Sequence, residues 1–242
     1  NLQLTTYNLQ PTTYNLQRTM DYTLLITATA GHIRSQFEGE GSGHDWWHIY
    51  RVWKTAARIG EMEGADGVVV QLAALLHDIA DWKFHDGDDE AGPRLARQWL
   101  EGLEVEEPLI AHVCTIIKEL SFKGAGVPTP MSTLEGRVVQ DADRLDAIGA
   151  IGIARAFAYG GHKSRELYNP DIPPVMHASF EAYKQNKGTT VNHFYEKLLL
   201  LKDRMNTPAA RQMAGERHAF METFLQRFLQ EWHAEGGQWE RV

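Results

Sequence analysis

The chain has 242 residues, of which 43% are hydrophobic and 23% charged, an ordinary composition for a globular protein. Its formal net charge is −8 and it has no block rich in Lys and Arg, which argues against a sequence-independent nucleic-acid binder. No apolar run approaches the roughly 20 residues that a membrane span requires. The single cysteine, Cys114, excludes an intramolecular disulfide and a thiolate zinc cluster, and we expect a cytoplasmic protein. From the charge and the apolar runs we expect no stable nucleic-acid or membrane partner.

Residues 1–19 contain the hexamer TTYNLQ twice and lack helical periodicity, so we predict an extension outside the folding unit. From residue 20 to residue 235 we predict one all-α domain, because no linker separates two compositions. Apolar residues recur at helical spacing near residues 21–38, 46–62, 67–82, 89–103, 106–120, 132–158, 173–186, 191–202 and 208–233. Thr207 and Pro208 have the residue types of an N-cap and a first helical position.

The stretch GSGHDWWHIYRVW, residues 41–53, places His44 and His48 four residues apart with Asp45 between them. Zinc peptidases use this spacing on one helix, with a glutamate between the histidines as general base. Asp45 is one methylene shorter than glutamate. The preceding GSG also indicates that a helix begins here with Asp45 near its N-cap, which favours a different kind of site.

Two later stretches add ionisable groups to apolar helices. The segment VVVQLAALL leads directly into His77 and Asp78, a pair that is costly beside a buried face unless it is hydrogen-bonded or bound to a metal. Asp141, Asp143 and Asp146 crowd the segment near 132–158, where arginines or a metal could balance their charge. Two imidazoles and two carboxylates would form an N/O site for one divalent ion such as Mn, Fe, Ni, Zn or Mg.

In their order along the chain, these stretches resemble the HD-domain metal-dependent phosphohydrolases. The resemblance covers most of residues 20–233 and rests on HDWWHIYRVW, LLHDIADWKF, VVQDADRLDAIGAIGIAR, HFYEKLLLLKDRMNT and GERHAFME. It implies one helical HD domain around a metal. The implied ligands are His48, His77, Asp78 and Asp143, the last because it precedes Arg144 and Leu145 as the family's last ligand precedes its own "xL" step.

The similar small bacterial proteins include manganese-dependent pyrophosphohydrolases. The resemblance therefore implies hydrolysis of nucleoside or deoxynucleoside triphosphates to monophosphate and pyrophosphate by metal-activated water. Mn is the first choice of metal, with Mg, Ni, Co, Fe and Zn as alternatives. A nucleoside monophosphate phosphatase, a cyclic-nucleotide phosphodiesterase and a non-catalytic nucleotide-binding module stay as alternatives. The base, the sugar and the oligomeric state, including a homo-oligomer, are left open.

Further roles are hypotheses for the same site. Asp81 follows His77 by one turn and could transfer a proton. Arg51, three residues after His48, could hold a phosphate or form a salt bridge with Asp143 or Asp146. Lys83 could act as a second catalytic cation or lie on the surface. Candidate substrate-binding cations are Arg144, Lys118, Lys123, Lys197 and Arg217.

Overall fold

The computed structural model of the chain describes residues 20–38, 45–80, 88, 90–120, 129–175 and 188–234. Within these ranges the chain is helical and contains no strand, which confirms the predicted all-α fold. The extension predicted over residues 1–19 lies outside the described residues, as does most of the helix predicted near 173–186. Among the helices described, none is long and apolar enough to cross a bilayer.

The described helices follow the predicted segments closely, apart from two divisions, near 132–158 and 191–202, and one shortened helix. They are α1 (Tyr22–Phe37), α2 (Trp46–Glu63), α3 (Gly67–Leu76), α4 (Ala91–Gly102), α5 (Glu107–Leu120), α6 (Leu134–Asp146), α7 (Gly149–His162), α9 (Thr190–Glu196), the 3-10 helix η2 (Leu198–Arg204) and α10 (Pro208–Trp232). The shortened helix is α3, which was expected to reach residue 82 and ends at Leu76, immediately before the His-Asp pair.

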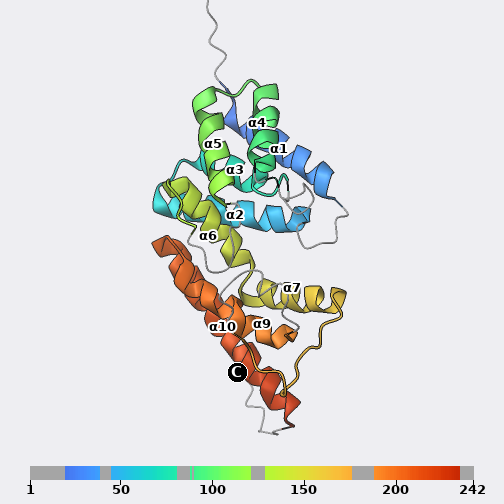
Figure 1. Cartoon of the computed structure of the whole chain (residues 1–242). Helices are drawn as coiled ribbons and strands as arrows, with labels where there is room; N and C mark the ends of the chain where they lie inside the picture. The colour runs from blue at the N-terminus through green and yellow to red at the C-terminus, as the bar shows by residue number, and fades with distance from the viewer. Residues whose placement is uncertain are drawn as a thin grey trace, which may run out of the picture.

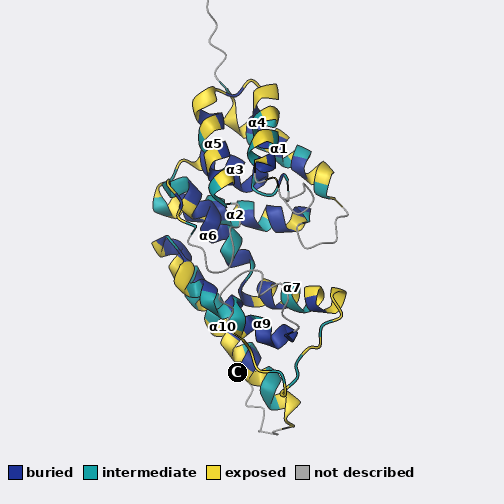
Figure 2. Ribbon diagram, viewed as in Figure 1, coloured by how far each residue is buried: buried dark blue, intermediate teal, exposed yellow. Residues whose placement is uncertain are grey.

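The helices form an upper group, α1 to α5, and a lower group, α7, α9 and α10, with α6 running between them (Figure 1). Helix α3 lies at the centre of the upper group, in contact with α1, α2, α5 and α6. Most of its residues are buried (Figure 2). A helix that is apolar on nearly all sides is stable only inside a core. The core therefore fixes the end of α3, and with it the position of His77 and Asp78.

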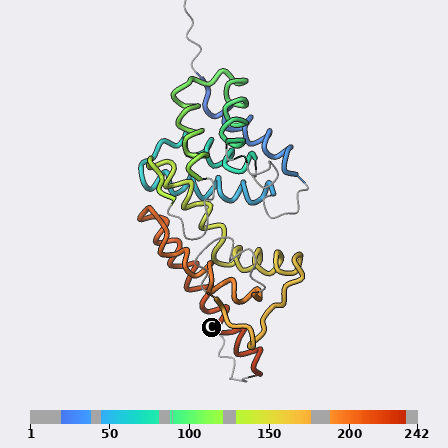
Figure 3. Tube along the Cα trace, viewed as in Figure 1, coloured from blue at the N-terminus to red at the C-terminus, as the bar shows by residue number. Residues whose placement is uncertain are grey.

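The segment predicted as one helix near 132–158 is two helices, which corrects that prediction. Between α6 and α7 the chain changes direction sharply (Figure 3). Gly149 begins α7 with φ +75°, a left-handed conformation that residues with a Cβ rarely adopt. A Cβ at this position would also lie 2.9 Å from Cγ of Arg217, which packs over the turn from α10. The break turns α7 so that Arg155 lies beside the end of α6.

The lower group packs through aromatic side chains from three helices. Phe157 of α7 has its ring centroid 5.9 Å from that of Phe194 in α9 and 5.8 Å from that of Phe224 in α10. These spacings are typical of packed aromatic pairs. At the start of α10, the Thr207 side chain caps the helix and Pro208 occupies its first turn, which confirms the predicted start.

Candidate metal centre

Helix α2 supplies His48 from its first turn. The Asp45 side chain accepts a hydrogen bond from the His48 backbone N–H at 2.8 Å, which confirms Asp45 as the N-cap. His44 precedes this cap and lies outside the described residues. The peptidase arrangement requires both histidines within one helix, so the helix start argues against it. His48 itself is buried, with 2% of its surface exposed.

The end of α3 supplies His77 and Asp78. The Nδ1 atom of His77 lies 2.8 Å from the carbonyl oxygen of Ala74, and a carbonyl can only accept, so Nδ1 carries the proton. In the neutral ring this leaves a lone pair on Nε2. That atom is buried without a hydrogen-bond partner in the described part of the chain. A buried polar atom without a partner is expected where a ligand or ion binds.

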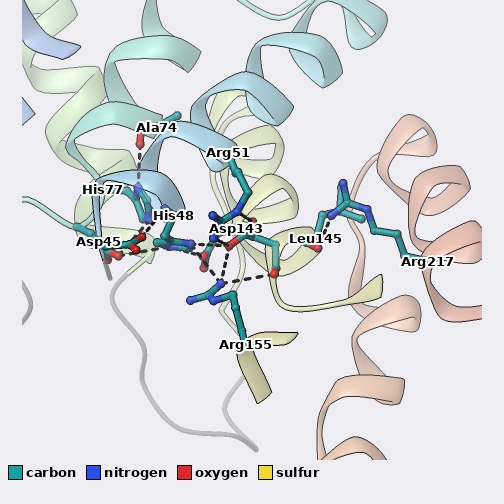
Figure 4. Close-up of polar contacts among 11 residues, drawn as sticks. Asp45, His48, Arg51, Ala74, His77, Asp143, Leu145, Arg155 and Arg217 are labelled. Atoms are coloured by element: carbon teal, nitrogen blue, oxygen red, sulfur yellow. Dashed lines mark hydrogen bonds and ion pairs between the residues drawn. The ribbon is translucent and has the colours of Figure 1, made fainter. Parts of the chain in front are cut away.

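The side chains of three separate segments converge (Figure 4). The ligand atoms of His48, His77 and Asp78 all lie within 4.8 Å of one another. Oδ2 of Asp78 is 3.5 Å from Nε2 of His48 and 3.4 Å from Nε2 of His77. Oδ1 of Asp143, from α6, is also 3.5 Å from Nε2 of His48. Two ligands about 2.1 Å from one ion in tetrahedral geometry are about 3.4 Å apart, so the spacing of His48, His77 and Asp78 fits a divalent cation. Asp143 adjoins this group through its contact with His48.

The three aspartates of α6 face different neighbours. Asp143 is half-exposed and faces His48. Asp141 is fully buried and accepts hydrogen bonds from Asn206 and Thr207 at the start of α10. Asp146 is buried at the end of the helix, behind His48. This placement favours Asp143 over Asp141 as the fourth ligand.

Asp146 is surrounded by cationic and polar hydrogen-bond donors. Its Oδ2 lies 2.7 Å from Nδ1 of His48 and 2.5 Å from Nη1 of Arg155. Arg51 binds the same carboxylate through Nε at 2.7 Å and Nη2 at 3.0 Å. Arg51 therefore forms the salt bridge that the sequence offered as the alternative to phosphate binding. Asp146 was a candidate partner of Arg51 in the sequence, but its contact with His48 was not expected. Arg155 ends the matching block VVQDADRLDAIGAIGIAR and was given no role, because only the packing of α7 brings it beside Asp146.

The carboxylates around His48 change its protonation. Burial acts to lower the pKa of His48, but hydrogen bonds with Asp146 and Asp78 outweigh burial and raise the pKa to about 9. Burial alone would raise the pKa of Asp146, yet its bonds with His48 and Arg51 hold that pKa far below the usual range. In the metal-free protein at neutral pH, His48 is therefore an imidazolium whose positive charge lies among these carboxylates. A metal ion that binds there must displace its proton.

This raised pKa predicts how the stability of the metal-free protein depends on pH. A pKa of about 9 in the folded protein, against 6.5 as the reference value, gives stability that is fully present below pH 6.5. That stability is lost as the pH rises through 9, at a cost on the order of 3 kcal/mol. We expect thermal unfolding in EDTA to show a Tm drop of roughly 6–12 °C between pH 6.5 and pH 9.

The matched control is His48→Gln, which removes the titrating ring. Other titrating groups remain in that variant, so the relevant quantity is the difference between the two pH profiles. An equal Tm drop in wild type and His48→Gln would contradict the assignment of the raised pKa to His48.

The remaining predicted residues lie in other contacts or outside the described ranges. Arg144 donates to the carbonyl of Arg204 and to Oγ1 of Thr129, and Arg217 donates to the carbonyl of Leu145. Nζ of Lys118 lies 2.5 Å from Oε1 of Glu90, with both side chains exposed. Lys197 follows α9 and its backbone N–H bonds to the carbonyl of His193. Outside the described residues are Asp81, Lys83 and Lys123.

Comparisons with known proteins agree with this geometry. Residues 46–148 match the family described as the HD domain. The chain is 42% identical over 195 residues to the protein YpgQ of Bacillus subtilis. This alignment covers 80% of the chain and 86% of YpgQ. Among solved structures, an HD-superfamily hydrolase from Bacillus thuringiensis is 45% identical, with a TM-score of 0.71, over 88% of this chain and all of that chain. YpgQ in complex with ADP is 38% identical, with a TM-score of 0.63, over 84% of this chain and 96% of that chain. The matched residues 46–148 contain all four candidate ligands.

Proposed function

The chain belongs to the HD superfamily of metal-dependent phosphohydrolases, and we propose that it hydrolyses nucleoside or deoxynucleoside triphosphates to monophosphate and pyrophosphate. The convergence of His48, His77 and Asp78 carries the hydrolytic part of this proposal. The nucleotide part is supported by the similar protein YpgQ, whose structure has been solved in complex with ADP.

In this proposal His48, His77, Asp78 and Asp143 hold one divalent cation, with Mn²⁺ as the proposed ion. When bound, the cation would polarise a phosphate oxygen and lower the pKa of a water molecule. The chain prepares the imidazole ligands through their Nδ1 atoms, since His77 is held by the carbonyl of Ala74 and His48 by Asp146. Asp143 is the most exposed of the four candidate ligands, with 45% of its side-chain surface accessible. In this proposal the substrate approaches the centre from that side.

The charges around the centre favour an anionic substrate once the metal is present. Among the described residues, the carboxylates that contact the ring of His48 (Asp78, Asp143 and Asp146) and the arginines bonded to Asp146 (Arg51 and Arg155) leave one net negative charge when the histidines are neutral. A divalent cation converts this to one net positive charge. Opposite charges attract strongly in a partly buried site, where water screens them poorly.

We propose further roles for the other candidates in the same reaction. Asp81 would transfer the proton, Lys83 would add a cation, and Arg51 would support the phosphate through the network around Asp146. The exposed Lys118, with Lys123 and Lys197, would contact distal phosphates. Arg144 and Arg217 would each have to leave a backbone carbonyl to reach a phosphate, so we place them last among the substrate-binding candidates.

The test is product-resolved turnover of a nucleotide panel with Mn²⁺, followed by phosphorus NMR. We expect each triphosphate to yield one monophosphate and one pyrophosphate. An analogue with an imido group between the β and γ phosphorus atoms should still be cleaved, because the α–β bond is intact. The matched analogue with the imido group between the α and β atoms should resist cleavage.

Each other outcome would indicate a different activity for this protein. Release of orthophosphate, with cleavage of the α–β analogue, would replace the proposal with a phosphatase. Turnover of monophosphates or cyclic nucleotides alone would favour those alternatives. Tight nucleotide binding without turnover with Mn²⁺, Co²⁺, Ni²⁺ or Mg²⁺ would indicate a non-catalytic module and overturn the proposal.

A further inference from the structure

Asp146 lies behind the metal centre and contacts one of its candidate ligands. Its Oδ2 is 2.7 Å from Nδ1 of His48, while Nε2 of the same ring faces Asp78 and Asp143 at 3.5 Å. We propose that Asp146 is a positioning residue: it keeps the proton of His48 on Nδ1 and thereby directs the lone pair of Nε2 to the metal. The inference rests on the proposed function in that it requires a metal at this centre.

The position of the proton decides whether His48 can bind a metal. A neutral imidazole carries one proton, and only its other nitrogen has a lone pair to donate to a cation. A carboxylate beside Nδ1 can only accept, so it selects the ring form with the proton on Nδ1. Asp146 is buried, so bulk water does not replace it in this contact. His77 has the same arrangement with a backbone carbonyl in place of the carboxylate.

Arg51 fixes the orientation of Asp146. Its Nε binds Oδ1 at 2.7 Å and its Nη2 binds Oδ2 at 3.0 Å, a two-pronged contact that holds the plane of the carboxylate. Because Asp146 cannot rotate freely, Oδ2 stays directed at the His48 ring. The contact also compensates the buried negative charge, which would otherwise be costly.

Arg155 lies where it could stabilise the other tautomer of the His48 ring, the one with the proton on Nε2. Nη1 of Arg155 is 2.5 Å from Oδ2 of Asp146 and only 3.3 Å from Nδ1 of His48 (Figure 4). A guanidinium only donates hydrogen bonds. If the carboxylate were neutralised, Arg155 could donate to a lone pair on Nδ1, and the ring proton would move to Nε2, where it blocks the metal. His48 thus has a hydrogen-bond partner for either tautomer, Asp146 when the proton is on Nδ1 and Arg155 when it is on Nε2. The charged carboxylate of Asp146 selects the first.

The test compares Asp146→Asn with wild type by calorimetric titration of the full chain with Mn²⁺. Asparagine keeps the size of the side chain but removes its charge, and its amide nitrogen can donate to Nδ1. We expect the affinity for Mn²⁺ to fall about 10- to 100-fold, the range typical of partners that orient metal-binding histidines. The matched control is Asp45→Asn, which also removes a carboxylate bonded to His48, but through the backbone N–H. Asparagine caps helices as well as aspartate, so we expect a change of less than about threefold.

A second measurement does not depend on the folding of the variant. Nitrogen NMR of wild-type protein with ¹⁵N-labelled histidines and bound Zn²⁺ should show His48 protonated on Nδ1 and metal-bound through Nε2. A proton on Nε2, or metal bound through Nδ1, would overturn the inference.

The two proposals fail separately. If wild type binds Mn²⁺ and Asp146→Asn binds it equally well, the positioning role is wrong and the proposed hydrolase stands. If wild type binds neither Mn²⁺ nor Zn²⁺, the proposed function fails and the positioning role fails with it.

Discussion

Replacing Asp78 by asparagine is expected to remove the bound metal and to lower turnover by about a thousandfold or more. Oδ2 of Asp78 lies 3.5 Å from Nε2 of His48 and 3.4 Å from Nε2 of His77, so it is the candidate ligand atom that lies close to both imidazole nitrogens. An amide has no charge to offset that of a divalent cation. A thousandfold loss corresponds to about 4 kcal/mol of transition-state stabilisation, within the several kcal/mol that a metal supplies. Elemental analysis of the purified variant and an assay of pyrophosphate release would measure both effects.

The fold should survive this change. Asp78 stands after the end of α3, and its side chain is 21% exposed, so asparagine leaves no cavity and can hydrogen-bond to water. The matched control is Asp203→Asn on the exposed face of η2, which should retain metal and turnover. If Asp78→Asn retained a full equivalent of metal and wild-type turnover, the centre would have to be built from other residues.

Replacing Asp141 by alanine is expected to destabilise the protein by about 3–5 kcal/mol. Oδ1 of Asp141 accepts hydrogen bonds from the backbone N–H and the side-chain amide of Asn206, and Oδ2 accepts from the backbone N–H and the hydroxyl of Thr207, each at 2.8 Å. Removing a fully buried acceptor leaves these donors without a partner, which costs about 1–3 kcal/mol for each group that water cannot reach. Thermal unfolding should show a Tm lower by about 10 °C or more.

Asp143→Ala is the matched control for this stability effect, because it lies in the same helix two residues later. Its half-exposed side chain faces the metal centre, so in EDTA the variant should unfold within about 2 °C of wild type. The affinities for Mn²⁺ should follow the opposite order. Asp143→Ala should bind the metal weakly, and Asp141→Ala should bind it well while folded. Equal stability losses in EDTA would show that the two aspartates do not have separate roles.

Much of the fold could be predicted because helices are determined by local patterns. The three- and four-residue spacing of apolar side chains located most of the helices, and Asp45 and Thr207 marked helix starts through their side-chain chemistry. The division between α6 and α7 was missed, because the apolar spacing continues across it, and a glycine in a sequence does not show whether it adopts a left-handed conformation, as Gly149 does, or which side chain packs over it.

The candidate metal ligands could be proposed because their residue types stand at unusual places in apolar helices and match a family in order. Burying His77 and Asp78 at the end of α3 is costly without a partner, and that cost is visible in the amino-acid sequence alone. The sequence could not say how α2, α3 and α6 pack. The geometry of the centre depends on that packing, because its side chains come from three segments far apart in the chain.

The three aspartates of α6 show where local information ends. Helical spacing places Asp141, Asp143 and Asp146 on known faces of one helix, but it does not identify the neighbour of each face. Those neighbours are α10, the metal centre, and Arg155 across the turn to α7. Residue types and their spacing therefore specified the helices and a set of candidate ligands. The role of each carboxylate was set by packing between distant segments, because the energy of a buried charge depends on the groups that surround it.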